Sequence, residues 1–358
     1  MAISPLASIA AAIAAWLLIG ALALVRPHAL RIVRSLFTAG ALVGIAMAVV
    51  ALVALRERPD AIILPLGLPD LPFHLRVDAL SASFLVLLGV ASAAISLYSS
   101  GYFRAEETGA PGLVCFQYHA FLAAMGLVLV ADDAYLFMVA WETMALASFF
   151  LVTTDHRIPE VRRAGFLYLL IAHVGAIGIL LCFGVLQGGR GDYAFDAMRA
   201  VTLAGNWPSV AFFLALFGFG AKAGLLPLHI WLPEAHPAAP SPISALMSGV
   251  MLKMAIYGLL RVTFDLLHVQ LWWWGAIALA IGLITALFGV IFAAAQTDMK
   301  RLLAYSSIEN IGIIVAGIAL TILFKSNDST LYVKPDKSLS CQFVFYSSLY
   351  WVLTEREK

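Results

Sequence analysis

Ten apolar segments of membrane-spanning length follow one another along this chain, and they constrain its fold more than any other feature. A transmembrane helix needs about 20 mostly apolar residues, because the hydrocarbon core is about 30 Å thick. With 62% hydrophobic and 12% charged residues, the chain is too apolar for a soluble globule. The sequence therefore predicts an all-α, polytopic membrane protein. The predicted spans are residues 4–25, 31–55, 78–98, 112–131, 133–153, 163–187, 209–231, 241–265, 271–295 and 301–324.

Most of the links between these spans are short and polar. Residues 56–76 contain LPLGLPDLP, which is too polar and too rich in proline to cross a membrane, so we expect an extended loop there. The fourth and fifth predicted spans are separated only by Asp132 and Asp133.

The seventh span is predicted to be broken. The stretch from Lys222 to Arg261 reads KAGLLPLHIWLPEAHPAAPSPISALMSGVMLKMAIYGLLR and contains five prolines before its second apolar half. Proline removes a helical hydrogen bond and clashes with the preceding turn, so we expect the helix to break near Pro227 and to restart only after Pro242. Backbone groups freed in lipid must meet protein or trapped water.

Lys253 lies deep in the eighth predicted span. If that span begins near Ser241, about 12 residues at roughly 1.5 Å each place the lysine about 18 Å into the membrane. Burial disfavours the charged ammonium, so such a lysine can take up and release protons. A lysine that snorkels or forms a structural pair is the alternative.

Other ionisable residues fall at similar depths. Glu142, His173, Lys222 and Glu309 lie 9 to 13 residues inside their spans, which is roughly 13–20 Å at 1.5 Å per residue. Charges that are merely tolerated gather near the ends of spans, so this pattern predicts a polar row at the membrane midplane that relays protons. The alternatives are a structural ion pair for Glu142 and a helix–helix hydrogen bond for His173.

His229, Glu234 and His236 surround the predicted break. We expect them, with Pro227 and Pro233, to line the broken helix, and His229 to take part in the relay. The spacing HxWLPxxH lacks a third ligand and is not a zinc pattern. The three cysteines, Cys115, Cys182 and Cys341, match no iron–sulfur or haem spacing, so we predict no cofactor and no metal.

Charge patterning suggests an orientation. Lysines and arginines in alternate links form two sets: Arg26, Arg31, Arg34, Arg104, Arg157, Arg162, Arg163, Lys300 and Arg301 on one side, and Arg56, Arg58, Arg76, Arg190, Arg199 and Arg261 on the other. The larger set is predicted to be cytoplasmic, which places the amino terminus outside. A net charge of +1 argues against nucleic acid as a partner.

The composition changes after Phe324. Residues 325–358 contain no alanine and no glycine, although both are abundant elsewhere. We expect this segment to be a poorly ordered tail without tertiary anchoring.

Four motifs resemble one family, the proton-conducting, antiporter-like membrane subunits shared by complex I, multisubunit sodium/proton antiporters and energy-converting hydrogenases. They are VDALSASF at 77–84, AWET at 140–143, the proline-rich stretch from Lys222 to Lys253, and QTDMKRLLAYSSIENIG at 296–312. The resemblance covers roughly residues 70–320. The ending SSIENIG is more similar to hydrogenase-4 component B and formate hydrogenlyase subunit 3 than to complex I subunits.

The resemblance implies a fold of some fourteen helices with two inverted five-helix repeats. It implies that Glu142, Lys222 and Lys253 form one proton half-channel, and that Glu309 leads toward a second. This chain turns into unrelated sequence after about ten spans, so we expect a truncated version of that fold. The expected divisions are residues 1–111, 112–265 for the first repeat, 266–324 for a partial second repeat, and 325–358 for the tail.

These expectations lead to one main functional hypothesis. We expect a non-catalytic, proton-translocating subunit of a hydrogenase-type or complex I-like oxidoreductase assembly in a bacterial inner membrane, where partner subunits carry out electron transfer. The alternatives are a subunit of a multisubunit sodium/proton antiporter, or a truncated and inactive remnant.

Overall fold

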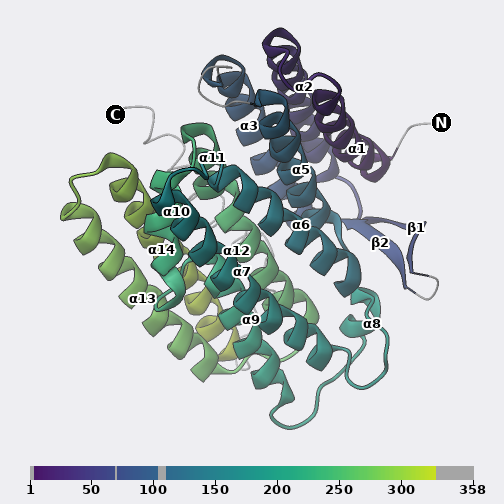
Figure 1. Ribbon diagram of the computed structural model, residues 1–358. Helices are drawn as coiled ribbons and strands as arrows, with labels where there is room; N and C mark the ends of the chain where they lie inside the picture. Colours follow the sequence, from purple (N-terminus) through teal and green to yellow (C-terminus); the bar gives the residue numbers. More distant parts are fainter. Residues whose placement is uncertain (1–3, 69–70, 104–109, 328–358) are drawn as a thin grey trace. The chain divides into compact units, whose positions relative to one another are not determined.

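The computed structural model describes residues 4–68, 71–103 and 110–327, and it is almost entirely helical (Figure 1). Within these residues, ten helical segments are long and apolar enough to cross a membrane, which confirms the predicted all-α, multi-pass architecture. The uninterrupted spans are α1 (Pro5–Val25), α2 (Leu30–Ala54), α3 (Ala79–Tyr102), α5 (Pro111–Val130), α6 (Ala134–Val152), α7 (Pro159–Leu186), α13 (Trp272–Ala294) and α14 (Met299–Asn327). The seventh and eighth spans are each built from several shorter elements.

The described chain divides into two compact units. The first comprises the residues up to Leu169 together with Pro237–Met254, and the second comprises Leu170–His236 together with the residues from Ala255 onward. In the first unit α2 packs on α3, α1 packs on α5, and α5 packs on α6. In the second unit α13 packs on α14 along its length.

Small residues bring α13 and α14 close together. A Cβ atom added at Gly282 would lie 2.9 Å from the carbonyl oxygen of Gly312, and one added at Gly289 would lie 2.8 Å from the Cα of Glu309. Membrane helices associate through such close backbone approach, because lipid removes the hydrophobic drive for association. Glu309 is therefore held against the backbone of α13.

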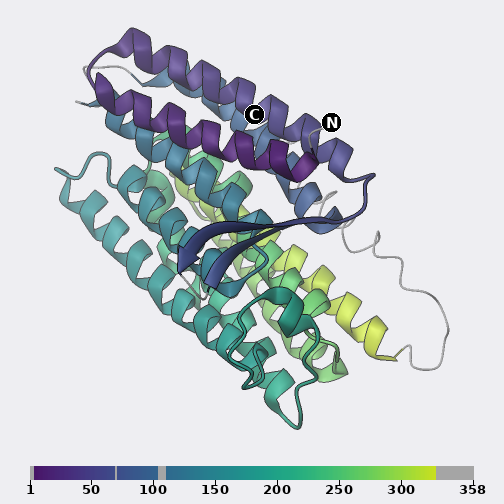
Figure 2. The ribbon, with the colours of Figure 1, turned by 90° about the vertical axis from the view of Figure 1, so that its right-hand side faces the viewer.

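A β-hairpin occupies the link for which we expected an extended loop (Figure 2). Strand β1 (Asp60–Leu68) pairs antiparallel with β2 (Leu71–Val77), and the register shifts between Leu64 and Gly67. Pro65 falls inside that shift, where its missing N–H group interrupts no regular ladder. The prolines that prevent a helix here are thus compatible with a bulged hairpin.

The hairpin is fixed to the turn between α5 and α6. The amide of His74 donates to Asp133 Oδ2 at 2.7 Å, and the amide of Asp132 donates to the His74 carbonyl oxygen at 2.8 Å. Asp133 also caps α6 by accepting a hydrogen bond from the amide of Leu136 at 2.6 Å. Burial raises the pKa of Asp133 above its usual range, although these backbone donors partly oppose the shift. The side chain of Asp133 and the backbone of Asp132 therefore attach the hairpin to the start of α6.

The observed helices agree closely with the predicted spans. The sixth begins at Pro159 rather than near residue 163, because proline suits the first turn of a helix. The last helix, α14, includes Lys325, Ser326 and Asn327, which we had assigned to the tail. The rest of the predicted tail, residues 328–358, lies outside the described residues.

Candidate functional site

The seventh span breaks at a glycine, three residues before the expected proline. Helix α9 (Trp207–Ala223) ends at Gly224, whose φ of 82° lies in the left-handed region. The Gly224 amide still donates to the Gly220 carbonyl oxygen at 2.9 Å. Glycine reaches this conformation without a Cβ penalty and so ends a helix cleanly. The proline at 227 then prevents the helix from resuming.

Short elements carry the chain past the break. They are η1 (Leu228–Trp231), α10 (Leu232–Ala238) and α11 (Ser241–Leu246). Helix α11 contains Pro242 in its first turn, so the helix restarts before the point that we predicted. Proline is tolerated there because the first amides of a helix have no partner within the helix.

Side chains satisfy the backbone around this break within the second unit. The indole N–H of Trp231 donates to the Ala221 carbonyl oxygen at 2.9 Å. The amide of Leu226 donates to Thr285 Oγ1 of α13 at 3.3 Å. Lipid offers no hydrogen bonds, so these internal partners are what a broken span requires.

Lys222 lies in the last turn of α9 and is 2% exposed. The carboxyl end of a helix carries partial negative charge, which stabilises a cation. The position of Lys222 therefore follows from the helix end that Gly224 creates.

Lys253 lies in α12 (Leu252–Leu260) and is 3% exposed. Its Nζ donates to the carbonyl oxygen of Ser248 at 2.8 Å. Ser248 belongs to η2, a π-helical turn that spans Met247–Met251. Such turns loosen the regular hydrogen-bond ladder and often occur at functional sites. The buried ammonium thus obtains a backbone acceptor from its own helix.

Glu142 lies on α6 in the first unit and is half-buried. It lies six residues before Ser148 on the same helix, and the hydroxyl of Ser148 contacts that of Tyr168 on α7. The helix that carries Glu142 thus also carries a buried hydroxyl that was not predicted from the sequence.

Two predicted relay residues lie at less buried positions in the second unit. His173 is exposed on α7, on a face that it shares with exposed Leu170, Val174 and Ile177. Glu309 is half-buried on α14, against Gly289 of α13. Each would have to act from the surface of the described chain.

The residues expected to line the break differ in their environment. His229 is half-buried, with its ring edge on Phe288 at a centroid distance of 4.7 Å. Glu234 is exposed and lies 3.5 Å from Arg301. His236 and Pro233 are buried in α10, whereas Pro227 is exposed. Within this group, Pro233, Glu234 and His236 belong to α10 and His229 belongs to η1, whereas Pro227 precedes η1.

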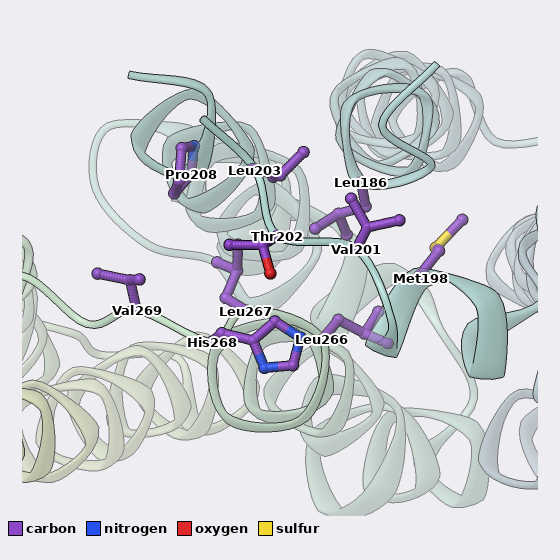
Figure 3. Close-up of a pocket in the computed structure, with 10 residues that line it drawn as sticks. All are labelled: Leu186, Met198, Val201, Thr202, Leu203, Pro208, Leu266, Leu267, His268 and Val269. Atoms are coloured by element: carbon purple, nitrogen blue, oxygen red, sulfur yellow. The ribbon is translucent and has the colours of Figure 1, made fainter. Parts of the chain in front are cut away.

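The second unit contains a small cavity, and none of the predicted relay residues is among the residues that line it (Figure 3). It measures about 10 Å³, which is space for about one water molecule. Its lining is mainly apolar and includes Met198, Thr202 and His268. Beside it, the guanidinium groups of Arg199 and Arg261 both contact Asp265, at 2.9 and 3.1 Å. This cluster fixes α8 (Phe195–Arg199) to η3 (Arg261–Leu266), the end of the eighth span.

Sequence analysis missed four residues near Lys253 and Glu142. They are Ser148, Tyr168, Ser248 and Met251, none of which carries a charge. The hydroxyl residues lie deep in apolar spans, as the charged residues do. Serine and tyrosine are common in such spans, however, so depth alone does not mark them as functional.

Two buried lysines, each at a discontinuity of a transmembrane helix, define a class of site. Broken helices at mid-membrane depth are typical of proteins that move ions, because freed carbonyls and helix ends contact the ion or its carrier. A buried lysine amine can change its protonation state when a nearby charge moves. The fold and the lysines thus define a multi-pass membrane protein with a buried lysine at each of two interrupted spans.

The chain belongs to the NADH:quinone oxidoreductase/Mrp antiporter transmembrane family, whose model matches residues 131–330. The model of the NADH-ubiquinone oxidoreductase (complex I) chain 5 N-terminus matches residues 64–111. This confirms the family that the sequence motifs suggested.

Hydrogenase-4 component B of Escherichia coli (strain K12) is 44% identical over 252 residues, which cover 70% of this chain and 37% of that protein. Formate hydrogenlyase subunit 3 of the same organism is 32% identical over 248 residues, or 69% of this chain and 39% of that protein. The structure of the Mrp complex from Dietzia sp. DQ12-45-1b matches with a TM-score of 0.76 and 26% identity, over 87% of this chain and 34% of that chain. The chain therefore spans well under half the length of these relatives.

Proposed function

We propose that this chain is a proton-translocating membrane subunit of a hydrogenase-type or complex I-like assembly, and that partner subunits carry out the redox chemistry. The observation that carries the proposal is the pair of buried lysines, Lys222 and Lys253, held at two helix discontinuities. The identity to hydrogenase-4 component B and formate hydrogenlyase subunit 3 favours this assembly over a sodium/proton antiporter.

In this proposal, each lysine holds a proton and releases it when its electrostatic surroundings change. Ionised Glu142 stabilises an ammonium nearby, and its neutralisation withdraws that support. The carbonyl of Ser248 provides Lys253 with a hydrogen-bond acceptor in the resting arrangement. Glu309, His173 and His229 extend the route. Pro227, Pro233, Glu234 and His236 line the broken segment.

The proposed location is a bacterial inner membrane, with the amino terminus outside the cytoplasm. The bias of lysine and arginine between alternate links supports this orientation. The proposed partners are further membrane subunits, consistent with the complex named for the similar solved structure.

Proton uptake tests the proposal. Membrane vesicles from cells that express the full chain with its assembly are loaded with a pH-sensitive dye, and Lys253→Ala and Lys222→Ala are compared with the parent. We expect both variants to insert normally and to lose coupled proton transfer. Lys325→Ala, which changes an exposed lysine, is the matched control. Normal proton uptake in both buried-lysine variants would rule out the relay.

A further inference from the structure

Ser148 and Tyr168 form a buried pair of hydroxyl groups that the proton relay described above does not use. Ser148 lies on α6 and Tyr168 on α7, and both are 0% exposed. Their oxygens are 2.5 Å apart. The two buried hydroxyls are thus hydrogen-bonded to each other, and either can be the donor.

Each end of this pair has a further acceptor. Ser148 Oγ lies 2.7 Å from the Met144 carbonyl oxygen and 3.0 Å from that of Ala145. The Tyr168 hydroxyl lies 3.7 Å from the sulfur of Met251. The two hydroxyls carry one proton each, so they cannot satisfy all of these acceptors at once.

Two arrangements of the protons follow. In the first, Tyr168 donates to Ser148, and Ser148 donates to the Met144 carbonyl. In the second, Ser148 donates to Tyr168, and Tyr168 donates to Met251. Rotation of the two hydroxyls interconverts them without moving a heavy atom. Only the second arrangement holds the sulfur of Met251.

The pair connects two parts of the first unit that matter for the proposed function. At one end, Glu142 precedes Ser148 by six residues on α6, which is about 9 Å along the helix axis. At the other end, Met251 belongs to the π-helical turn whose Ser248 carbonyl accepts the hydrogen bond of Lys253. The hydroxyl dipoles reverse between the two arrangements, so ionised and neutral Glu142 favour different ones.

We propose that Ser148 and Tyr168 are positioning residues that couple the charge state of Glu142 to the turn that holds Lys253. This inference rests on the proposed function and deepens it. The direction of the Ser148–Tyr168 hydrogen bond reverses when Glu142 gains or loses a proton. The π-helical turn is then held or released, because Tyr168 donates to Met251 in only one of the two arrangements.

The same unit contains a matched control. Ser96 of α3 and Tyr118 of α5 are also 0% exposed, and their oxygens are 2.9 Å apart. Either hydroxyl can donate in this pair, but within the described residues neither has a third partner that would be held or released when the direction of the bond reverses. Tyr118→Phe therefore removes the same atom from the same kind of pair without removing a switch.

Proton uptake in vesicles that carry the full chain and its assembly tests the inference. We expect Tyr168→Phe to lower uptake about tenfold, the size typical of coupling between groups in one hydrogen-bonded network. We also expect it to flatten the pH dependence of uptake and to weaken the effect of Glu142→Gln made in the same chain. Tyr118→Phe should leave all three quantities close to the parent.

Variants of Ser148 provide a second measurement in case Tyr168→Phe inserts poorly. Ser148→Ala should reproduce the loss, and Ser148→Thr, which keeps the hydroxyl, should restore uptake. If Tyr168→Phe and Ser148→Ala match Tyr118→Phe while Lys253→Ala still abolishes uptake, the coupling is wrong and the proposed function stands. If Lys253→Ala also leaves uptake unchanged, both fail.

Discussion

Lys222 and Lys253 are almost equally buried, but the chain accommodates them by opposite means. Lys222 lies at the end of a helix that stops at a left-handed glycine, where the helix dipole favours a cation. Lys253 lies in a span that continues past it. Its hydrogen-bond acceptor is the carbonyl of Ser248, in the π-helical turn that directly precedes α12. One lysine depends on a complete break, and the other on a local loosening.

This difference shows that a membrane span can accommodate a buried lysine in two ways, which differ in how much of the backbone hydrogen bonding they disrupt. A complete break requires new partners for several backbone groups, which Trp231 and Thr285 provide. A π-helical turn keeps the rest of the ladder intact. The loosened turn can therefore change its geometry with less rearrangement than a complete break can.

The largest expected effect comes from replacing either lysine by arginine. Arginine retains the positive charge but does not release a proton in proteins, so Lys222→Arg and Lys253→Arg should each reduce proton uptake about a hundredfold or more. Uptake in vesicles measures this, with the exposed Lys325→Arg as control. If an arginine variant retains full uptake, that lysine acts as a fixed charge, and the comparison between two titrating sites breaks.

The next effect concerns the carboxylate on the Lys253 side of the comparison. Glu142→Gln preserves size and hydrogen bonding but cannot become negatively charged, so uptake should fall about thirtyfold, within the usual range for coupled sites. Glu142→Ala should be only slightly worse. A fully active glutamine variant would make Glu142 a structural residue.

The smallest expected effect tests the helix end at Lys222. Gly224→Ala forces a left-handed φ on a residue with a Cβ, which would also collide with the side chain of Leu232. We expect a loss of about 1–2 kcal/mol in the free energy of unfolding, measured as a lower apparent Tm in detergent.

Gly184→Ala is the matched control for this change. Gly184 lies within α7 in the same unit, and no atom lies within 4 Å of an added Cβ. Its stability should be unchanged or slightly increased, because alanine favours helix more than glycine does. If Gly224→Ala also leaves Tm unchanged, the left-handed helix end does not determine the position of Lys222.

The sequence by itself determined the number and approximate bounds of the spans, because the thickness of the bilayer imposes one length on every apolar helix. It also selected Lys222 and Lys253, because a charge deep in an apolar run is costly and rarely accidental. The roles predicted for Glu142, Glu309, His173 and His229 remain predictions.

Only the tertiary structure decided how the backbone is interrupted at these lysines. The prolines predicted an interruption, but they did not predict that the helix ends at Gly224, because the left-handed conformation of that residue depends on the elements packed around it. The π-helical turn before Lys253 has no sequence signature of its own. Its backbone hydrogen bonds span one residue more than those of an α-helix, and packing decides which of the two patterns forms. The Ser148–Tyr168 contact joins two helices, and uncharged side chains in an apolar span reveal their partners only when the helices pack.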